Sequence, residues 1–90
     1  MTQAYGLRIS GQAARALAEV LPEKVAAAAY EFIVGPLLEN PHRVGKPLNP
    51  PLHPAWTARR GSYRILYFIN DDQRLVEVTA VRHRADSYRT

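Results

Sequence analysis

Hydrophobic residues near the start of the chain first alternate with polar ones and then recur every three or four positions. Segment 4–10 has the alternating pattern, whose period of two predicts a half-buried strand. Ser10 has a side chain suited to capping a helix, and an alanine-rich amphipathic pattern follows over residues 11–21. We expect the buried stripe of this first helix to comprise Ala13, Ala14, Leu17, Ala18 and Leu21.

A second amphipathic helix is predicted from Glu23, because Pro22 ends the first helix and suits the first turn of the next. With almost no linker between them, the two helices should form a tight antiparallel hairpin. The pair Gly35-Pro36 predicts a kink, since proline removes one backbone hydrogen bond, and Asn40-Pro41 should end the helix. We expect its buried stripe to comprise Val25, Ala29, Phe32, Ile33 and Leu37.

The segment 41–54 contains five of the seven prolines, so it is predicted to be a stiff loop without regular structure. Three strands are predicted after it, over residues 56–61, 63–70 and 74–83. The intervening sequence 70–73 has residues that tolerate tight turns, which predicts an antiparallel hairpin for the last two strands.

The middle strand of the three has a continuous apolar face on alternate residues, and we assign this face to the helices. The order β-α-α-β-β-β then predicts one α+β domain over residues 1–90. In this domain the helical hairpin packs on one face of a twisted antiparallel sheet, and the other face is partly open. The face assigned to the helices comprises Tyr63, Ile65, Tyr67 and Ile69.

Composition adds a charge pattern to this fold. The net charge is +4, and nine of the twelve basic residues lie at or after Arg43, so the positive field belongs to the C-terminal half. An anionic partner such as nucleic acid is the expected consequence. The chain has no cysteine and shows neither a signal peptide nor a membrane-spanning run, from which we expect a soluble cytoplasmic protein.

Strand alternation predicts which basic residues reach the open face. Thr57 and Arg59 share one side of their strand, whereas Arg60 falls on the other side. Arg64 lies opposite the apolar row, so Arg59 and Arg64 can converge on the open face. Arginine forks match phosphate oxygens and aromatic rings stack on bases, so such a cluster suits a phosphodiester ligand. A single strand arginine, however, is more often a solvated edge that blocks aggregation. The last strand adds Arg82, His83, Arg84, Tyr88 and Arg89 at one end of the sheet.

Metal and nucleophile signatures are missing from the sequence. No histidines or carboxylates have metal-ligand spacing, and no nucleophile elbow or phosphate-cradling glycine loop occurs. We therefore expect a site without metal or other cofactor.

Three segments resemble the RelE toxins of the RelE/ParE toxin superfamily: KPL (46–48), WTARRGSYRILYFIND (56–71) and VRHRADSYR (81–89). The helix-rich start fits the same family, so the resemblance spans nearly the whole chain. It implies a RelE-like, microbial-ribonuclease-like fold and a toxin of a type II toxin–antitoxin system. Such a toxin is an mRNA interferase, which cleaves messenger RNA in the ribosomal A site and is inhibited by a RelB-like antitoxin encoded beside it.

The resemblance also implies roles for individual residues in a metal-free reaction, in which the ribose 2′-hydroxyl attacks the adjacent phosphate. Arg59 is similar to the second of two basic residues on its strand, and Arg64 to the arginine that stabilises the phosphate. Arg84 is similar to the arginine that supports the leaving group and stacks on a base. Tyr88 is similar to the C-terminal tyrosine that positions or deprotonates the 2′-hydroxyl. Lys46, Arg82 and Arg89 are expected to bind RNA.

Thr57 departs from the family pattern, because it stands where well-known members have the first basic residue of the pair. His83 is a candidate substitute as an acid or base near neutral pH, although alternation points it away from Arg84. Two other functions stay open. One is a ParE-like toxin that inhibits DNA gyrase without cutting RNA, and the other is a basic nucleic-acid-binding module without catalysis.

Overall fold

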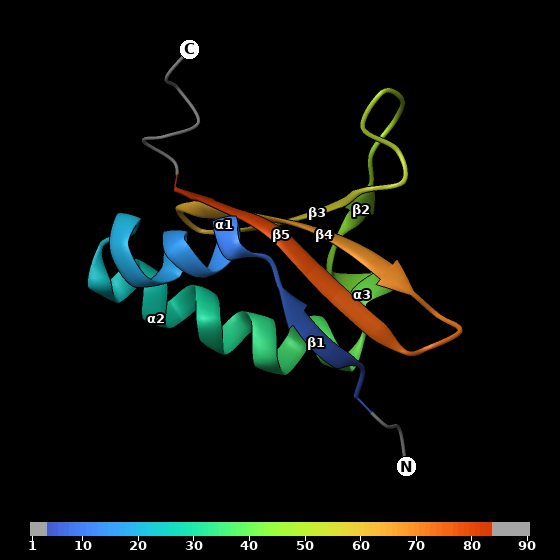
Figure 1. Cartoon of the computed structure of the whole chain (residues 1–90), viewed down its shortest axis with the longest axis horizontal. Helices are drawn as coiled ribbons and strands as arrows, with labels where there is room; N and C mark the ends of the chain where they lie inside the picture. Colours follow the sequence, from blue (N-terminus) through green and yellow to red (C-terminus); the bar gives the residue numbers. More distant parts are fainter. Residues whose placement is uncertain (1–3, 84–90) are drawn as a thin grey trace.

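The computed structural model describes residues 4–83 of the chain, which form a five-stranded sheet with helices on one side (Figure 1). Strand order in the sheet is β1-β5-β4-β3-β2. The α+β class and the helical hairpin on one face are confirmed. The elements are β1 (Gly6–Ile9), α1 (Gly11–Arg15), the π-helical segment η1 (Ala16–Val20), α2 (Glu23–Phe32), the π-helical segment η2 (Ile33–Leu37), α3 (Pro41–Val44), β2 (Lys46–Pro47), β3 (Trp56–Arg60), β4 (Tyr63–Asn70) and β5 (Leu75–His83).

The first helix begins as predicted, but its buried stripe is narrower. The Ser10 hydroxyl accepts a hydrogen bond from the Ala13 amide at 3.1 Å, which caps α1. Beyond Arg15 the backbone changes to π-helical winding, and the Leu21 amide bonds to the Ala16 carbonyl five residues earlier. This winding turns the helix relative to a 3.6-residue period. Ala14 and Ala18, predicted to be buried, are exposed, whereas Ala13 and Leu21 lie in the core and Leu17 is half-buried.

The second helix has the predicted stripe, with Ala29, Phe32, Ile33 and Leu37 buried and Val25 half-buried. The disturbance expected at Gly35-Pro36 is present as η2, which contains Pro36. Proline cannot donate the usual helical hydrogen bond, so the backbone accommodates it by a wider turn.

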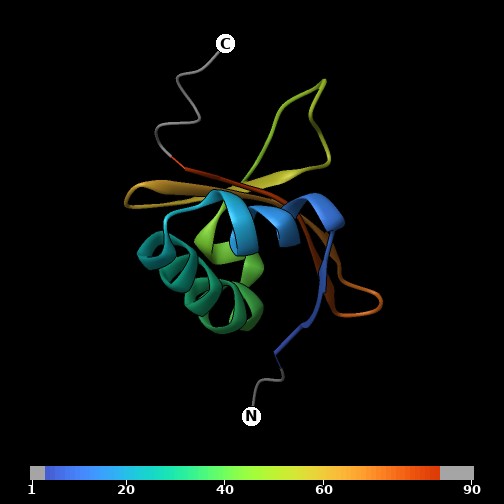
Figure 2. The same ribbon diagram turned by 60° about the vertical axis from the view of Figure 1, so that its left-hand side comes forward.

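The sheet is mixed, which corrects the prediction of a purely antiparallel one. Strands β3, β4 and β5 pair antiparallel as predicted, but β1 pairs parallel to β5, with Leu7 opposite Val76. In the sequence, the helical hairpin and three other strands separate β1 from β5. In space, β1 and β5 are neighbours at one edge of the sheet (Figure 2).

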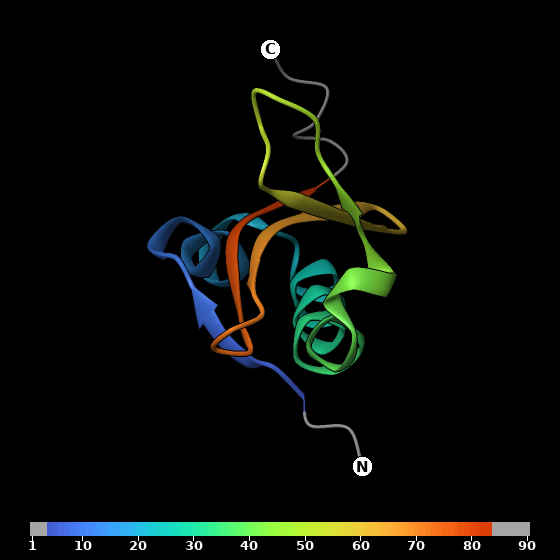
Figure 3. The same ribbon diagram turned by 90° about the vertical axis from the view of Figure 1, so that its right-hand side faces the viewer.

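The proline-rich segment is more ordered than predicted. Pro41 occupies the first turn of α3, where its missing amide hydrogen leaves no helical bond unmade. Strand β2 then pairs antiparallel with β3. Only the part from residue 48 to 55 is a loop, and it projects away from the helices on the other side of the sheet (Figure 3).

The core lies between the helices and one face of the sheet. Ile65 and Tyr67 of β4 and Ile33 and Leu37 of η2 are all fully buried, and Tyr63 is nearly so. Ile69, at the end of the same row, packs against this core while half-buried. The predicted apolar row of β4 therefore faces the helices. No helix in the described part of the chain is long and apolar enough to cross a membrane.

Candidate functional site

Three arginines form a row across the open face of the sheet. Arg59 of β3 pairs directly with Arg64 of β4, and Arg64 pairs directly with Arg82 of β5. All three side chains are exposed, and within residues 4–83 none forms an ion pair with a carboxylate. Like charges directly opposite each other destabilise a sheet. The arrangement is therefore unfavourable for the free protein and well suited to an anion.

A β-bulge turns Arg82 to this face. Leu66 pairs with Ala80 and the next residue, Tyr67, pairs with Val78, so Thr79 is an extra residue in β5. Strict alternation from Val78 would point Arg82 toward the helices. The extra residue reverses the alternation beyond it, as bulges commonly do beside functional sites. Sequence reasoning missed the bulge, since no glycine or proline marks it.

Arg60 lies on the opposite face from Arg59, as alternation predicts. Its guanidinium stacks over the Phe32 ring of α2, 4.7 Å from the ring centroid. Beside it, the Tyr63 hydroxyl donates a hydrogen bond to the Ala28 carbonyl at 3.2 Å, and burial raises the pKa of Tyr63. Arg60 belongs to the packing between sheet and helices.

A second row on the open face lies next to the arginines. Thr57 pairs with Lys46 of β2 on one side and with Leu66 of β4 on the other. The Lys46 side chain is exposed. The Thr57 hydroxyl is buried and has no hydrogen-bond partner in the described protein. Lys46 is therefore placed beside the arginine row, at a strand the sequence had not predicted.

The remaining predicted residues do not join this row in the described structure. His83 pairs with Tyr63, so its register puts it in the row that faces the helices and not beside Arg82 on the open face. Arg84, Tyr88 and Arg89 lie outside the described residues.

A polar cluster at the far end of the sheet was also missed, because its members are distant in sequence. The Tyr5 hydroxyl donates to Asp71 at 2.5 Å, and the His42 imidazole contacts the other carboxylate oxygen at 3.0 Å. The hydrogen bond from Tyr5 lowers the pKa of Asp71 and raises the pKa of Tyr5. Trp56 contacts the His42 ring edge-on, with the ring centroids 5.5 Å apart. This cluster joins the β4–β5 turn to α3 and the start of β1.

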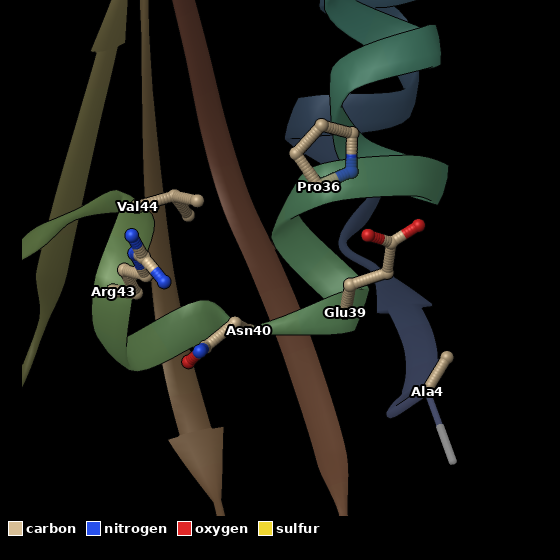
Figure 4. Close-up of a pocket in the computed structure, with 6 residues that line it drawn as sticks. All are labelled: Ala4, Pro36, Glu39, Asn40, Arg43 and Val44. Carbon is tan, nitrogen blue, oxygen red and sulfur yellow. The ribbon is translucent and has the colours of Figure 1, made fainter. Parts of the chain in front are cut away.

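The cavity in Figure 4 is on the helical side of the molecule and includes none of the predicted site residues. It lies where the end of the second helix meets α3. Ala4, Pro36, Glu39, Asn40, Arg43 and Val44 line it.

Comparisons with known proteins agree with the fold and the arginine-bearing sheet. Residues 7–88 match the family described as the ParE toxin of type II toxin–antitoxin systems. The chain is 51% identical to toxin RelE of Mycobacterium tuberculosis over 85 residues, covering 94% of this chain and 87% of the relative. It is 46% identical to toxin RelG of the same organism, with 94% and 97% covered.

Among solved structures, the RelBE2 toxin–antitoxin complex of M. tuberculosis contains a chain that matches with a TM-score of 0.87 and 43% identity. The match covers 91% of this chain and 100% of that one. Fold and sequence thus define a toxin of a type II toxin–antitoxin system. The chain belongs to the RelE/ParE toxin superfamily and is a RelE-type member.

Proposed function

We propose that this toxin is an endoribonuclease that cleaves messenger RNA in the A site of the ribosome and so stops translation. The observation that carries the proposal is the row of exposed guanidiniums at Arg59, Arg64 and Arg82, which form no ion pair with a carboxylate of residues 4–83. A guanidinium binds two phosphate oxygens at once, and several together suit the charge of a pentacoordinate phosphorane. The 51% identity to a toxin named RelE supports the RelE type of target.

In the proposed reaction, the ribose 2′-oxygen forms a bond to the adjacent phosphorus and the bond to the 5′-oxygen breaks. The products are a 2′,3′-cyclic phosphate and a 5′-hydroxyl. Tyr88 positions the 2′-hydroxyl and takes its proton, Arg59 and Arg64 stabilise the phosphorane charge, and Arg84 supports the leaving oxygen. Tyr88 is the base, the arginines supply the positive charge, and the leaving 5′-oxygen takes its proton from solvent water, so the proposal includes no metal or cofactor.

Other basic residues serve as RNA contacts in this proposal. Lys46 and Arg82 extend the positive charge of the open face on either side of the central pair. Arg89, outside the described residues, is proposed as a further RNA contact. His83 is left out of the nuclease site, because its register partner is Tyr63 on the other face. Thr57 supplies no charge, and its hydroxyl is buried beneath the open face, so it is given no RNA contact.

We further propose that the toxin works in the cytoplasm and is held inactive there by a RelB-like antitoxin encoded beside it. The support is the 43% identical RelBE2 complex, in which a toxin of the same fold is bound to its antitoxin. An unneutralised basic face should bind an acidic and apolar antitoxin segment. Co-expression with the neighbouring gene product should give a stable complex, and two proteins that purify separately would contradict this part of the proposal.

Transcript-end mapping in cells expressing the toxin tests the nuclease. We expect new 5′ ends within translated codons for the wild type, and their loss with Arg64→Ala or Arg84→Ala. Arg64→Ala should retain its melting temperature, since the side chain is exposed.

A gyrase inhibitor is the competing function, which the match to a family named for ParE favours. Growth arrest with intact messenger RNA and accumulated gyrase–DNA breaks would support it and contradict the nuclease. RNA binding with neither messenger RNA cleavage nor gyrase–DNA breaks would indicate a nucleic-acid-binding module without catalysis.

A further inference from the structure

Strand β2 is two residues long, and Lys46 is its basic residue on the open face. Because Lys46 pairs directly with Thr57, the two side chains point to the same side of the sheet, which is also the side of Arg59. Lys46 and Arg59 are diagonal neighbours, and such neighbours lie about 7–8 Å apart, within reach of long side chains. The amine can therefore reach an anion held by the arginine row.

The backbone around Lys46 is held close to the sheet by a glycine. A Cβ atom on Gly45 would overlap the Tyr67 hydroxyl and would lie 2.6 Å from the Thr57 carbonyl oxygen. The Gly45 φ of −136° is one that any residue adopts, so the requirement is for space. Tyr67 in turn donates a hydrogen bond to the Pro41 carbonyl at 2.8 Å. The buried Tyr67 therefore contacts both α3, through Pro41, and the residue that precedes β2, Gly45.

The surroundings leave the amine available. Lys46 is exposed and forms no ion pair with any described residue, and its cross-strand neighbour Thr57 carries no charge. Glu77 lies on the same face, but its cross-strand register partners are Phe68 and Arg8, farther along the sheet from the arginine row.

We propose that Lys46 binds the RNA phosphate next to the one being cleaved, and that Gly45 is the positioning residue that holds β2 so that it can. This inference rests on the proposed nuclease function and specifies one of its RNA contacts. A single strand crossing the open face presents successive phosphates to a basic groove. The arginine row binds the phosphate that reacts, and Lys46 binds the adjacent phosphate of the same strand.

Cleavage of messenger RNA on purified ribosomes by the full-length toxin tests the proposal. Lys46→Gln should raise the half-saturating ribosome–mRNA concentration roughly tenfold with little change in the maximal rate, because a neighbouring phosphate is bound equally in ground and transition states. The slope of log affinity against log salt should fall by about one, as for the loss of one phosphate contact. Lys46→Arg should keep both properties of the wild type.

Lys24→Gln is the matched control. Lys24 is the other lysine of the chain, exposed on α2, and its removal changes the net charge equally. If the wild type cleaves and Lys46→Gln behaves like Lys24→Gln, the role of Lys46 is wrong while the nuclease stands. If the wild type itself fails to cleave, the proposed function fails.

A cross-strand exchange tests the placement. The double variant Lys46→Thr, Thr57→Lys keeps the amine in the same residue pair and should recover most of the affinity lost in Lys46→Thr. Its maximal rate should stay at the wild-type value, because a rise in that rate would instead mark a lysine acting as the basic residue that family members carry at position 57. No recovery, in a variant with an unchanged melting temperature, would overturn the shared-face argument.

Gly45→Ala tests the positioning residue, and it should raise the half-saturating concentration as Lys46→Gln does. Wild-type affinity in Gly45→Ala would overturn that role. Gly45→Ala also strains the backbone of β2, so its effect on affinity alone does not show where the Lys46 amine lies. The exchange of Lys46 and Thr57 tests that position separately, because it leaves Gly45 unchanged.

Discussion

Arg59 and Arg60 are neighbours in one strand, yet they belong to two different surfaces. Arg60 stacks over Phe32 between sheet and helices, whereas Arg59 lies on the open face directly opposite another arginine. A cation over an aromatic ring stabilises the fold by about 0.5–1 kcal/mol at exposed sites. Two guanidiniums directly opposite each other, with no ion pair to a carboxylate in the described part of the chain, destabilise it. The same residue type thus contributes to folding on one face and is favourable on the other only when a ligand is bound.

The contrast extends to the whole of β4. Tyr63, Ile65 and Tyr67 are buried against the helices, while Arg64 between them is exposed. Substitutions on the packed face should change the free energy of unfolding, and those on the open face should change toxicity.

The largest effect on stability is expected for Ile65→Ala. Ile65 is fully buried, and truncating a buried isoleucine costs about 2–5 kcal/mol through lost burial and the cavity that remains. Guanidinium denaturation monitored by Trp56 fluorescence should show a lower midpoint. The neighbouring substitution Arg64→Ala is the control and should stay within about 0.5 kcal/mol of wild type. Equal losses in the two variants would contradict the division between faces.

A smaller loss is expected for Tyr67→Phe. It leaves the Pro41 carbonyl without its hydrogen bond, at a cost of about 1–3 kcal/mol for a buried group. Burial also raises the pKa of Tyr67 to about 12 from an ordinary value near 10. The folded state therefore holds this proton more tightly than the unfolded state.

This contribution of Tyr67 is fully present below pH about 10 and is lost as the pH rises toward about 12. Denaturation midpoints measured across that interval should fall less steeply in Tyr67→Phe than in wild type. Identical pH profiles would show that the hydroxyl is not buried in solution.

The smallest effect on stability, and the sharpest comparison, is expected from Arg59→Ala and Arg60→Ala. Arg60→Ala should lower stability by about 0.5–1 kcal/mol and leave toxicity intact, since it removes a cation–π contact. Arg59→Ala should leave stability unchanged or slightly higher, because it relieves repulsion from Arg64, and it should reduce toxicity. The melting temperature and the growth arrest of each variant should be measured in parallel. A loss of stability in Arg59→Ala together with a loss of toxicity in Arg60→Ala would contradict the assignment of the two arginines to different faces.

Much of the fold could be predicted from local pattern. The strand 63–70 was predicted with the bounds it has, and so were the Ser10 cap, the turn at Pro22 and the disturbance at Pro36. Each depends on chemistry within a few residues. Strand β2 was missed because it is two residues long and the residue before it, Gly45, lies so close to Tyr67 that no side chain fits there, a proximity between residues far apart in sequence.

The candidate site was predictable only in part. Alternation correctly separated Arg59 and Arg64 from Arg60, because each pair lies within or across one continuous antiparallel hairpin. Alternation could not predict that Lys46 pairs with Thr57, because that pairing joins two separate strands. Arg84, Tyr88 and Arg89 lie outside the described residues, and their roles, like the catalytic and RNA-binding roles of all the other site residues, stay predictions.

By itself, the sequence determined the two faces of each strand, because side chains alternate along any extended backbone and the apolar row must be buried. Only the tertiary structure decided which faces meet. The parallel placement of β1, the register that sets Lys46 opposite Thr57, and the bulge at Thr79 that turns Arg82 outward all depend on pairing between distant segments. Such pairing is set by how the whole core packs, so no local pattern records it.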